Sequence, residues 1–183
     1  MSQHELTEEK LYHIAKEFEI DLDKLREFLH EFELFYEEVR QQHLASIMRA
    51  LELRVRKKNK KPDFKIVWAS MPKDSTKTTD AVGLQWPTKY AIAVPPELDL
   101  QHLRDYVAHE LGHLFYATEH PSDYNDKDLN QKMANVFGVF TMFARGLFYD
   151  EKAPKMNRRP WMKMINDIKL LSNREVGKLN ISE

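Results

Sequence analysis

Two histidines and a glutamate within residues 106–120 have the residue types and the spacing needed for metal-dependent hydrolysis. His109 and His113 are four positions apart, and Glu110 directly follows the first histidine. A helix has 3.6 residues per turn, so side chains four positions apart lie on one face and both imidazoles can reach one ion. Glu110 is about 100° further round the helix, where it can flank that ion as a general base. The pattern indicates a zinc site with a catalytic glutamate.

A simpler interpretation is a helix whose histidines are satisfied by neighbouring polar groups. The pair lies among four apolar residues, Val107, Leu111, Leu114 and Phe115. This pattern predicts a helix packed in the core, with the histidines at one edge of the packed face. Gly112 lies between the histidines, although glycine costs a helix interior about 1 kcal/mol relative to alanine. A segment packed closely against this turn would explain the glycine. We favour the metal site, because the complete motif is rare by chance.

The composition of the chain limits which other sites it can form. The 183 residues include no cysteine, so any metal must be bound through nitrogen and oxygen, and a cysteine nucleophile is excluded. The formal net charge of -1 gives no overall attraction to nucleic acid or to an anionic membrane. The N-terminus lacks the basic start and apolar run of a secretory signal, which predicts a cytoplasmic protein. The apolar stretch 133–149 contains Asn135 and Arg145 and is predicted to be a core helix, not a membrane span.

The elements around the motif predict an α+β fold. The motif helix is expected over residues 100–118, and an apolar helix is expected over 127–148. Three short strands are predicted before them, in "FKIVWAS", "VGLQW" and "KYAIAV", the last two as a hairpin. The polar loop 71–80 is expected near the site. A further helix is predicted over 161–171.

The N-terminal region is predicted to be a helical arm over residues 1–61, followed by a second domain over 62–183. A short helix is expected over residues 7–18, then an Asp cap at Asp21 or Asp23, then one long amphipathic helix through Leu25 and Leu51. This arm could pack on the second domain, form a homodimer or receive a protein partner. Residues 1–39 are mainly acidic, whereas 40–61 are mainly basic. Because the acidic part would repel a phosphate backbone, no direct nucleic-acid partner is expected.

The segments "KYAIAVPPELDLQHLRDYVAHELGHLFY" and "QKMANVFGVF" together resemble the ImmA/IrrE family of metallopeptidases. In that family a strand, a short loop, a His-Glu-x-x-His helix and a later Ala-Asn-x-Phe helix occur in this order. The resemblance covers about residues 62–149. It implies a zincin-like α+β core, one zinc ion and a protein substrate, often a helix-turn-helix repressor. It also implies that Asn135 accepts a hydrogen bond from a ligand histidine.

One position departs from the family pattern. The third ligand there is usually a glutamate four residues before the asparagine, and Gln131 occupies this position here. Glutamine offers a neutral oxygen, so zinc is expected to bind more weakly. As the third ligand we rank Gln131 first, because it occupies the family position, and Asp128 second, because its carboxylate suits zinc. His120, Asp123 or a group of the substrate are further alternatives. A site that no longer binds zinc would make the chain a catalytically silent protein-binding or regulatory module on the same fold.

Overall fold

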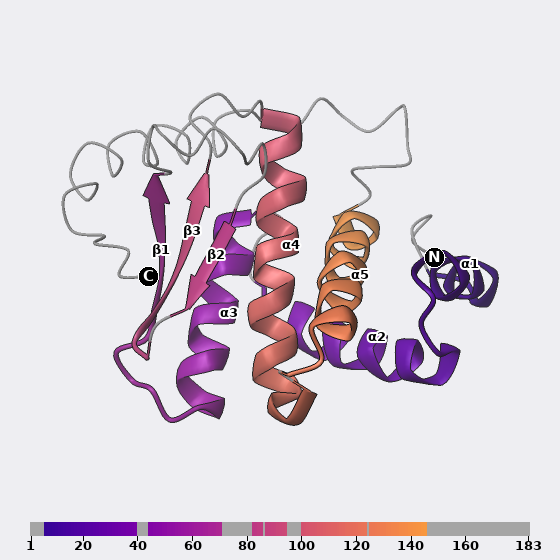
Figure 1. Cartoon of the computed structure of the whole chain (residues 1–183), viewed down its shortest axis with the longest axis horizontal. Coiled ribbons are helices and arrows are strands. Elements are labelled where there is room, and N and C mark those ends of the chain that lie inside the picture. The colour runs from indigo at the N-terminus through magenta and orange to yellow at the C-terminus, as the bar shows by residue number, and fades with distance from the viewer. Residues whose placement is uncertain are drawn as a thin grey trace.

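The computed structural model describes residues 6–39, 44–70, 82–85, 87–94, 100–123 and 125–145. The helices and strands occur in the order α1 (Glu8–Phe18), α2 (Leu22–Tyr36), α3 (Leu44–Lys58), β1 (Lys65–Ser70), β2 (Val82–Gln85), β3 (Lys89–Val94), α4 (Leu100–Glu119), the 3-10 turn η1 (Pro121–Asp123) and α5 (Lys127–Arg145). Figure 1 shows the sheet on one side of α4 and α5 on the other. The predicted mixed α+β class is confirmed. The helix predicted over 161–171 and the loop 71–80 lie outside the described residues.

Side-chain caps define where the first two helices begin. Thr7 accepts a hydrogen bond from the backbone N–H of Lys10. Asp21 accepts from the backbone N–H groups of Asp23 and Lys24, at 3.1 and 3.0 Å. These bonds satisfy amides that have no partner within the helix. Of the two aspartates predicted as the cap, Asp21 and Asp23, Asp21 is the one that caps α2.

The prediction of one long helix through Leu25 and Leu51 is wrong, because α2 and α3 are separate helices. The backbone N–H of Val39 donates to the carbonyl of Tyr36 at 3.0 Å, three residues back, which tightens the chain after the end of α2. Glu37 and Glu38 add negative charge at the negative end of the α2 dipole, and this disfavours continuation of the helix. The break allows both helices to turn their apolar faces toward one core.

The three N-terminal helices share a hydrophobic cluster with α4, α5 and the sheet. Aromatic rings from α2 contact rings from α4 and α5. The Phe35 and Phe115 centroids are 5.1 Å apart, and the Phe32 and Phe137 centroids are 5.5 Å apart. Of the three roles considered for the N-terminal helices, the structure shows packing on the rest of the chain. The division at residue 62 and the homodimer stay predictions.

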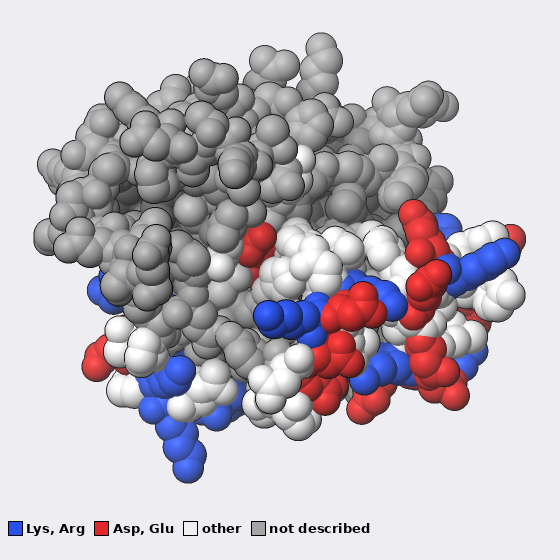
Figure 2. Space-filling view, in the orientation of Figure 1, with Lys and Arg blue, Asp and Glu red and all other residues white. Residues whose placement is uncertain are grey.

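Charged side chains gather on the face formed by α1, α2 and the start of α5 (Figure 2). Arg26 bridges α1 and α2 by contacting Glu8 at 2.8 Å and Asp23 at 2.7 Å. Such exposed pairs contribute little to stability, because water screens them. The charged face is a solvated surface of the fold.

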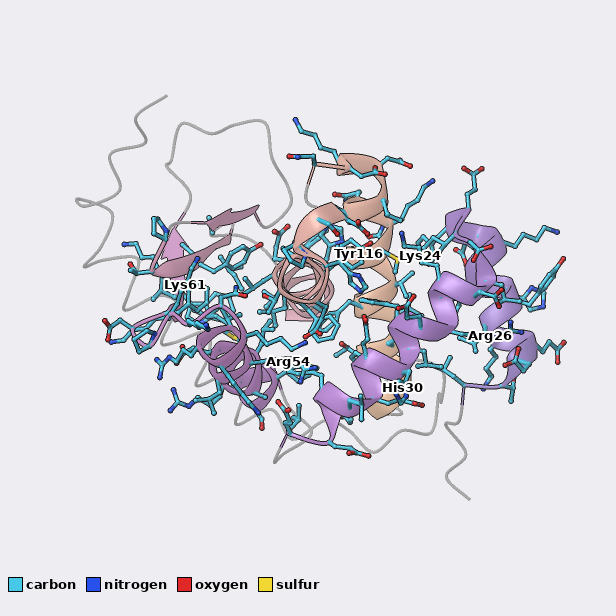
Figure 3. The ribbon with its side chains drawn as sticks, turned by 90° about the horizontal axis from the view of Figure 1, so that it is seen from below. Lys24, Arg26, His30, Arg54, Lys61 and Tyr116 are labelled. Atoms are coloured by element: carbon cyan, nitrogen blue, oxygen red, sulfur yellow. The ribbon has the colours of Figure 1, made fainter. Side chains whose placement is uncertain are left out.

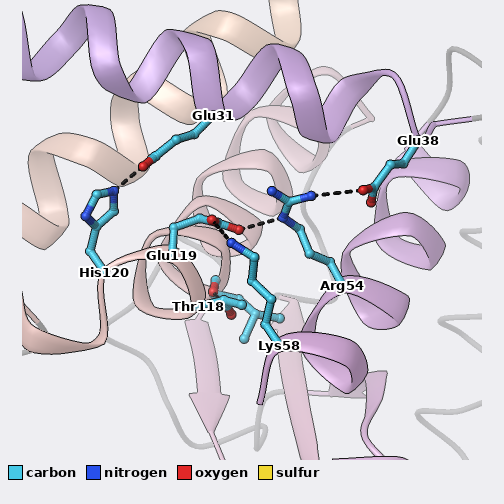
Figure 4. A network of polar contacts seen from close by, with 8 residues as sticks. Glu31, Glu38, Arg54, Lys58, Thr118, Glu119 and His120 are labelled. Carbon is cyan, nitrogen blue, oxygen red and sulfur yellow. Dashed lines mark hydrogen bonds and ion pairs between the residues drawn. The ribbon is translucent and has the colours of Figure 1, made fainter. Parts of the chain in front are cut away.

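A partly buried ion-pair network joins the end of α4 to α3 and to the residues that follow α2 (Figure 4). Arg54 on α3 donates to Glu119 at 2.5 Å and to Glu38 at 3.1 Å, and Lys58 also contacts Glu119. Seen from below, Arg54 lies between α3 and α2, close to α4 (Figure 3). Burial alone would raise the pKa of Glu119, but the hydrogen bonds from Arg54 and Lys58 outweigh it and lower that pKa. The N-terminal helices therefore contact the helix that carries the motif through charge as well as through apolar packing.

The sheet has the order β1-β3-β2, so β3 is its central strand. β3 runs parallel to β1 and antiparallel to β2. The predicted hairpin of β2 and β3 is confirmed. In its register Gly83 lies opposite Ile92, two residues after Tyr90 on β3. Because side chains alternate along a strand, Tyr90 and Ile92 point to the same face of the sheet.

α4 and α5 approach most closely at Gly112. A Cβ on Gly112 would lie 2.7 Å from the carbonyl oxygen of Ala134, 2.8 Å from its Cα and 2.9 Å from Cβ of Phe137. These distances are shorter than ordinary van der Waals contacts, so only glycine fits there without movement of α5. The close packing partner that the glycine indicated is confirmed, and it is the backbone of α5.

The apolar stretch that begins at residue 133 lies in this packed helix as far as Arg145. Met133, Val136, Phe137 and Phe140 are all buried, as expected for a core helix. Within the described parts of the chain, every helix is too short or too polar to cross a membrane.

Replacing Gly112 by alanine is expected to destabilise the protein. The added methyl group would push against the α5 backbone, and overpacking of this kind costs about 2 kcal/mol. Gly138→Ala is the matched control, because a Cβ at that position of α5 would meet no atom within 4 Å. Better helix propensity should make Gly138→Ala more stable than wild type by about 1 kcal/mol. Urea unfolding measures both, and equal effects would contradict the close approach.

Candidate metal centre

The two histidines of the motif face each other across one turn of α4. Their Nε2 atoms are 3.0 Å apart, and the two rings are nearly perpendicular at 87°. Two nitrogen ligands of one tetrahedral zinc ion lie about 3.3 Å apart, given Zn–N distances of about 2.05 Å. One nitrogen from His109, one from His113 and one carboxylate oxygen of Glu110 all lie within 4.8 Å of one another. The donor atoms therefore fit a single divalent ion.

An asparagine on α5 orients His113. Nδ1 of His113 lies 2.6 Å from Oδ1 of Asn130. That oxygen can only accept, so Nδ1 carries the proton and donates it, and Nε2 presents its lone pair toward His109. Metal-binding histidines commonly donate their second N–H in this way. The sequence interpretation passed over Asn130 and assigned this role to Asn135, which is half-buried on the same helix. The role of Asn135 stays a prediction.

Gln131 reaches the histidine pair from α5. Its amide nitrogen lies 3.0 Å from Nε2 of His109. A half-turn of the amide exchanges its nitrogen and oxygen, so the carbonyl oxygen can occupy the same place. Gln131 is exposed while both histidines are half-buried, so the pair borders solvent on this side. Among the side chains considered as the third ligand, Gln131 is the one that the structure brings to the histidines.

The other side chains considered as ligands have partners elsewhere. Asp128 forms an ion pair with Lys132 at 2.8 Å, and its side chain is 78% exposed. His120 lies 2.8 Å from the carboxylate of Glu31 on α2 (Figure 4). Asp123 accepts a hydrogen bond from the Tyr116 hydroxyl. Each contact leads away from the motif, so none of these three side chains joins the histidine pair.

Glu110 is buried between α4 and the sheet, with 8% of its surface exposed. The Tyr90 hydroxyl lies 3.0 Å from the backbone carbonyl oxygen of Glu110 and 3.3 Å from its Oε2. Burial raises the pKa of Glu110, and this outweighs the charge of His113 and the hydrogen bonds from the Gly83 backbone N–H and from Tyr90, which lower it. A carboxylate with a raised pKa is a stronger base than an ordinary glutamate.

Two strand residues that the sequence interpretation missed contribute to this site. A Cβ on Gly83 would collide with the Tyr90 hydroxyl and the Glu110 carboxylate. An isolated glycine within a strand often marks the close approach of another group. The sequence thus carried a signal at Gly83, but it did not show which groups approach.

The contacts around the pair explain why a cation fits between the two rings. If the Gln131 amide turns its oxygen toward His109, and both rings carry their proton on Nδ1 as the contact of His113 with Asn130 requires, both Nε2 lone pairs point into the same small space. Two lone pairs at 3.0 Å repel unless a proton or a metal ion lies between them. A divalent ion between the two rings would remove this repulsion by accepting both lone pairs.

Comparisons with protein-family models, with curated proteins and with solved structures found no match to this chain. The assignment of the site therefore depends on its own geometry.

Glu110→Gln is expected to stabilise the protein in the absence of metal at pH 7. The folded-state pKa of Glu110 is raised, so the stability associated with its neutral form is complete below about pH 4 and is lost as the pH rises through the folded-state pKa. Glutamine does not ionise, so the variant does not lose this stability as the pH rises. Thermal unfolding with a chelator should therefore show an advantage of the variant at pH 7 that disappears near pH 4. An advantage of the wild type at pH 7 would contradict the effect of burial.

Proposed function

We propose that this chain is a zinc-dependent endopeptidase of the ImmA/IrrE type, built on a zincin-like core. The observation that carries the proposal is the pair of imidazole nitrogens 3.0 Å apart, beside a buried glutamate on the same helix. His109 and His113 would hold the ion, and Gln131 would supply a neutral third ligand. The order of the strand, the motif helix and the later helix supports the family resemblance.

Each group around the site has a defined part in peptide hydrolysis. A zinc ion held there would polarise the substrate carbonyl and acidify a water molecule. Glu110 accepts a proton from the attacking water and delivers it to the leaving nitrogen, which its raised basicity favours. Asn130 keeps the proton of His113 on Nδ1 and leaves Nε2 free to bind. The exposed side of Gln131 provides the direction from which a substrate can approach.

The substrate class follows from the family resemblance. A protein partner, such as a helix-turn-helix repressor, is the substrate that the resemblance implies. The reaction is then limited proteolysis in the cytoplasm. We expect no nucleic acid and no membrane to take part directly.

A second candidate is a catalytically silent protein of the same fold that binds or regulates a protein partner. The neutral side chain of Gln131 favours it, because two imidazoles and an amide place no anion against the ion's double charge. The hydrogen bonds from α5 to His113 and His109 could also satisfy both rings without metal. The two candidates differ in cleavage, and a chain that does not bind zinc could only be the second.

Metal content after purification without chelator tests the site itself. Inductively coupled plasma mass spectrometry should find near-stoichiometric zinc in the wild type and none in His113→Ala. Gln131→Ala should lose much of its zinc, because the alanine removes the third ligand. Asp128→Ala is the matched control on α5 and should keep zinc, since Asp128 is paired with Lys132. A wild type that contains no zinc after dialysis against zinc would overturn the peptidase proposal.

Proteolysis tests the role of Glu110. The zinc-loaded wild type should cleave peptides in a library prepared from cellular protein, with products identified by mass spectrometry. Glu110→Gln should keep its zinc and its fold but lose at least about 100-fold in rate, which is the usual loss when a general base is removed. Asp128→Ala should cleave like the wild type. Zinc-loaded wild type without cleavage would instead favour the binding module.

A further inference from the structure

Glu110 lies where a metal ion would attract it as a ligand. Its carboxylate oxygen is within 4.8 Å of the nitrogens of both histidines. With Gln131 as a neutral third ligand, the set carries no negative charge, so attraction between a divalent ion and the nearest carboxylate is strong. A glutamate oxygen bound to the ion is no longer free to accept a proton. A peptidase built on this site needs a means of holding Glu110 away from the ion.

The sheet supplies two hydrogen-bond donors for this carboxylate. The Tyr90 hydroxyl shares its single proton between the backbone carbonyl oxygen of Glu110, at 3.0 Å, and the carboxylate Oε2, at 3.3 Å. The backbone N–H of Gly83 donates to the same carboxylate. Both donors come from strands, and the histidines come from α4. The carboxylate is therefore held on the sheet side of the helix.

The positions of both donors are determined by the strand ladders. Tyr90 lies on the central strand, where it pairs with Ile66 of β1 and Gln85 of β2. Its side chain is only 4% exposed, so its hydroxyl has little freedom to move. A Cβ at Gly83 would occupy the space where the hydroxyl and the carboxylate meet. Glycine at this position thus allows the three groups to converge.

We propose that Tyr90 and Gly83 are positioning residues that keep Glu110 out of the set of metal ligands and so preserve it as a base. The proposal rests on the proposed zinc site and adds a means by which that site stays catalytic with a neutral third ligand. Binding of the ion by Glu110 would break the hydrogen bonds that its carboxylate accepts from both strands. Tyr90 and Gly83 thereby oppose the attraction that the ion exerts on the carboxylate.

Zinc affinity of Tyr90→Phe tests the proposal. Phenylalanine keeps the buried ring and removes the hydroxyl, so Glu110 becomes free to turn toward the ion. Competition with a chromophoric zinc chelator should show zinc binding about tenfold tighter than in the wild type, since a hydrogen bond to a carboxylate contributes about this factor. The gain should disappear in Tyr90→Phe/Glu110→Gln. Glu110→Gln should therefore weaken zinc binding more in the Tyr90→Phe background than in the wild type.

The direction of this change separates positioning from structural damage. A variant that only loosens the fold would bind zinc as the wild type does or more weakly. Tyr116→Phe is the matched control, because it removes a hydroxyl that donates to Asp123 at 2.8 Å and leaves Glu110 untouched. It should leave zinc affinity unchanged. Circular dichroism confirms that each variant is folded.

Unchanged or weaker zinc binding by folded Tyr90→Phe would overturn the proposal and leave the metal site standing. So would a gain that persists without the Glu110 carboxylate. If Tyr90→Phe does not fold, Gly83→Ala provides the same comparison, because its methyl group displaces both the hydroxyl and the carboxylate. A crystal structure of the zinc-loaded wild type decides the matter without any substitution: a Glu110 oxygen about 2.0 Å from the ion contradicts the proposal. Absence of zinc binding in every variant would overturn the proposed function together with this inference.

Discussion

The close approach of α5 to α4 at Gly112 is the contact on which the candidate site depends. The backbone of α5 passes where any larger residue would place a side chain. Asn130 and Gln131 lie one turn before Ala134, the α5 residue that contacts Gly112. This position brings their amides against His113 and His109. A shift of α5 by the width of a methyl group would disturb both hydrogen bonds. The contact at Gly112 therefore determines both how closely α4 and α5 pack and where the two amides meet the histidines.

The site lies between α5 and the sheet, and these two sides differ in their exposure to solvent. On the α5 side, half-buried histidines and exposed Gln131 border solvent. On the sheet side, Glu110 is enclosed by Tyr90 and by the backbone of Gly83. Burial disfavours the ionised carboxylate, whereas the two donors and the nearby imidazole favour it. A buried glutamate destabilises the fold and is not needed to pack a helix. Its perturbed pKa is typical of a group that exchanges protons.

Local signals in the sequence predicted the parts of this arrangement that depend on one element. The spacing of His109 and His113 gave the shared helix face, and Gly112 indicated a close neighbour. The choice between Asn130 and Asn135 depends on the rotation of α5 against α4, because five residues turn a helix by about 140°. No residue pattern reports that rotation. The hydroxyl of Tyr90 reaches Glu110 only through the register of three strands, and the break between α2 and α3 has no glycine or proline to mark it.

The central position of β3 gives the sheet one local pairing and one non-local pairing. β2 and β3 are close in sequence and pair as a hairpin, so their ladder closes only a short loop. β1 pairs with β3 across a longer stretch of chain, since its parallel partner lies beyond β2 along the chain. Non-local pairings of this kind form late, because loop closure comes before the stabilising contacts. We therefore expect the hairpin that carries Gly83 and Tyr90 to form before β1 pairs with it, so that both strand groups that enclose Glu110 belong to the local part of the sheet.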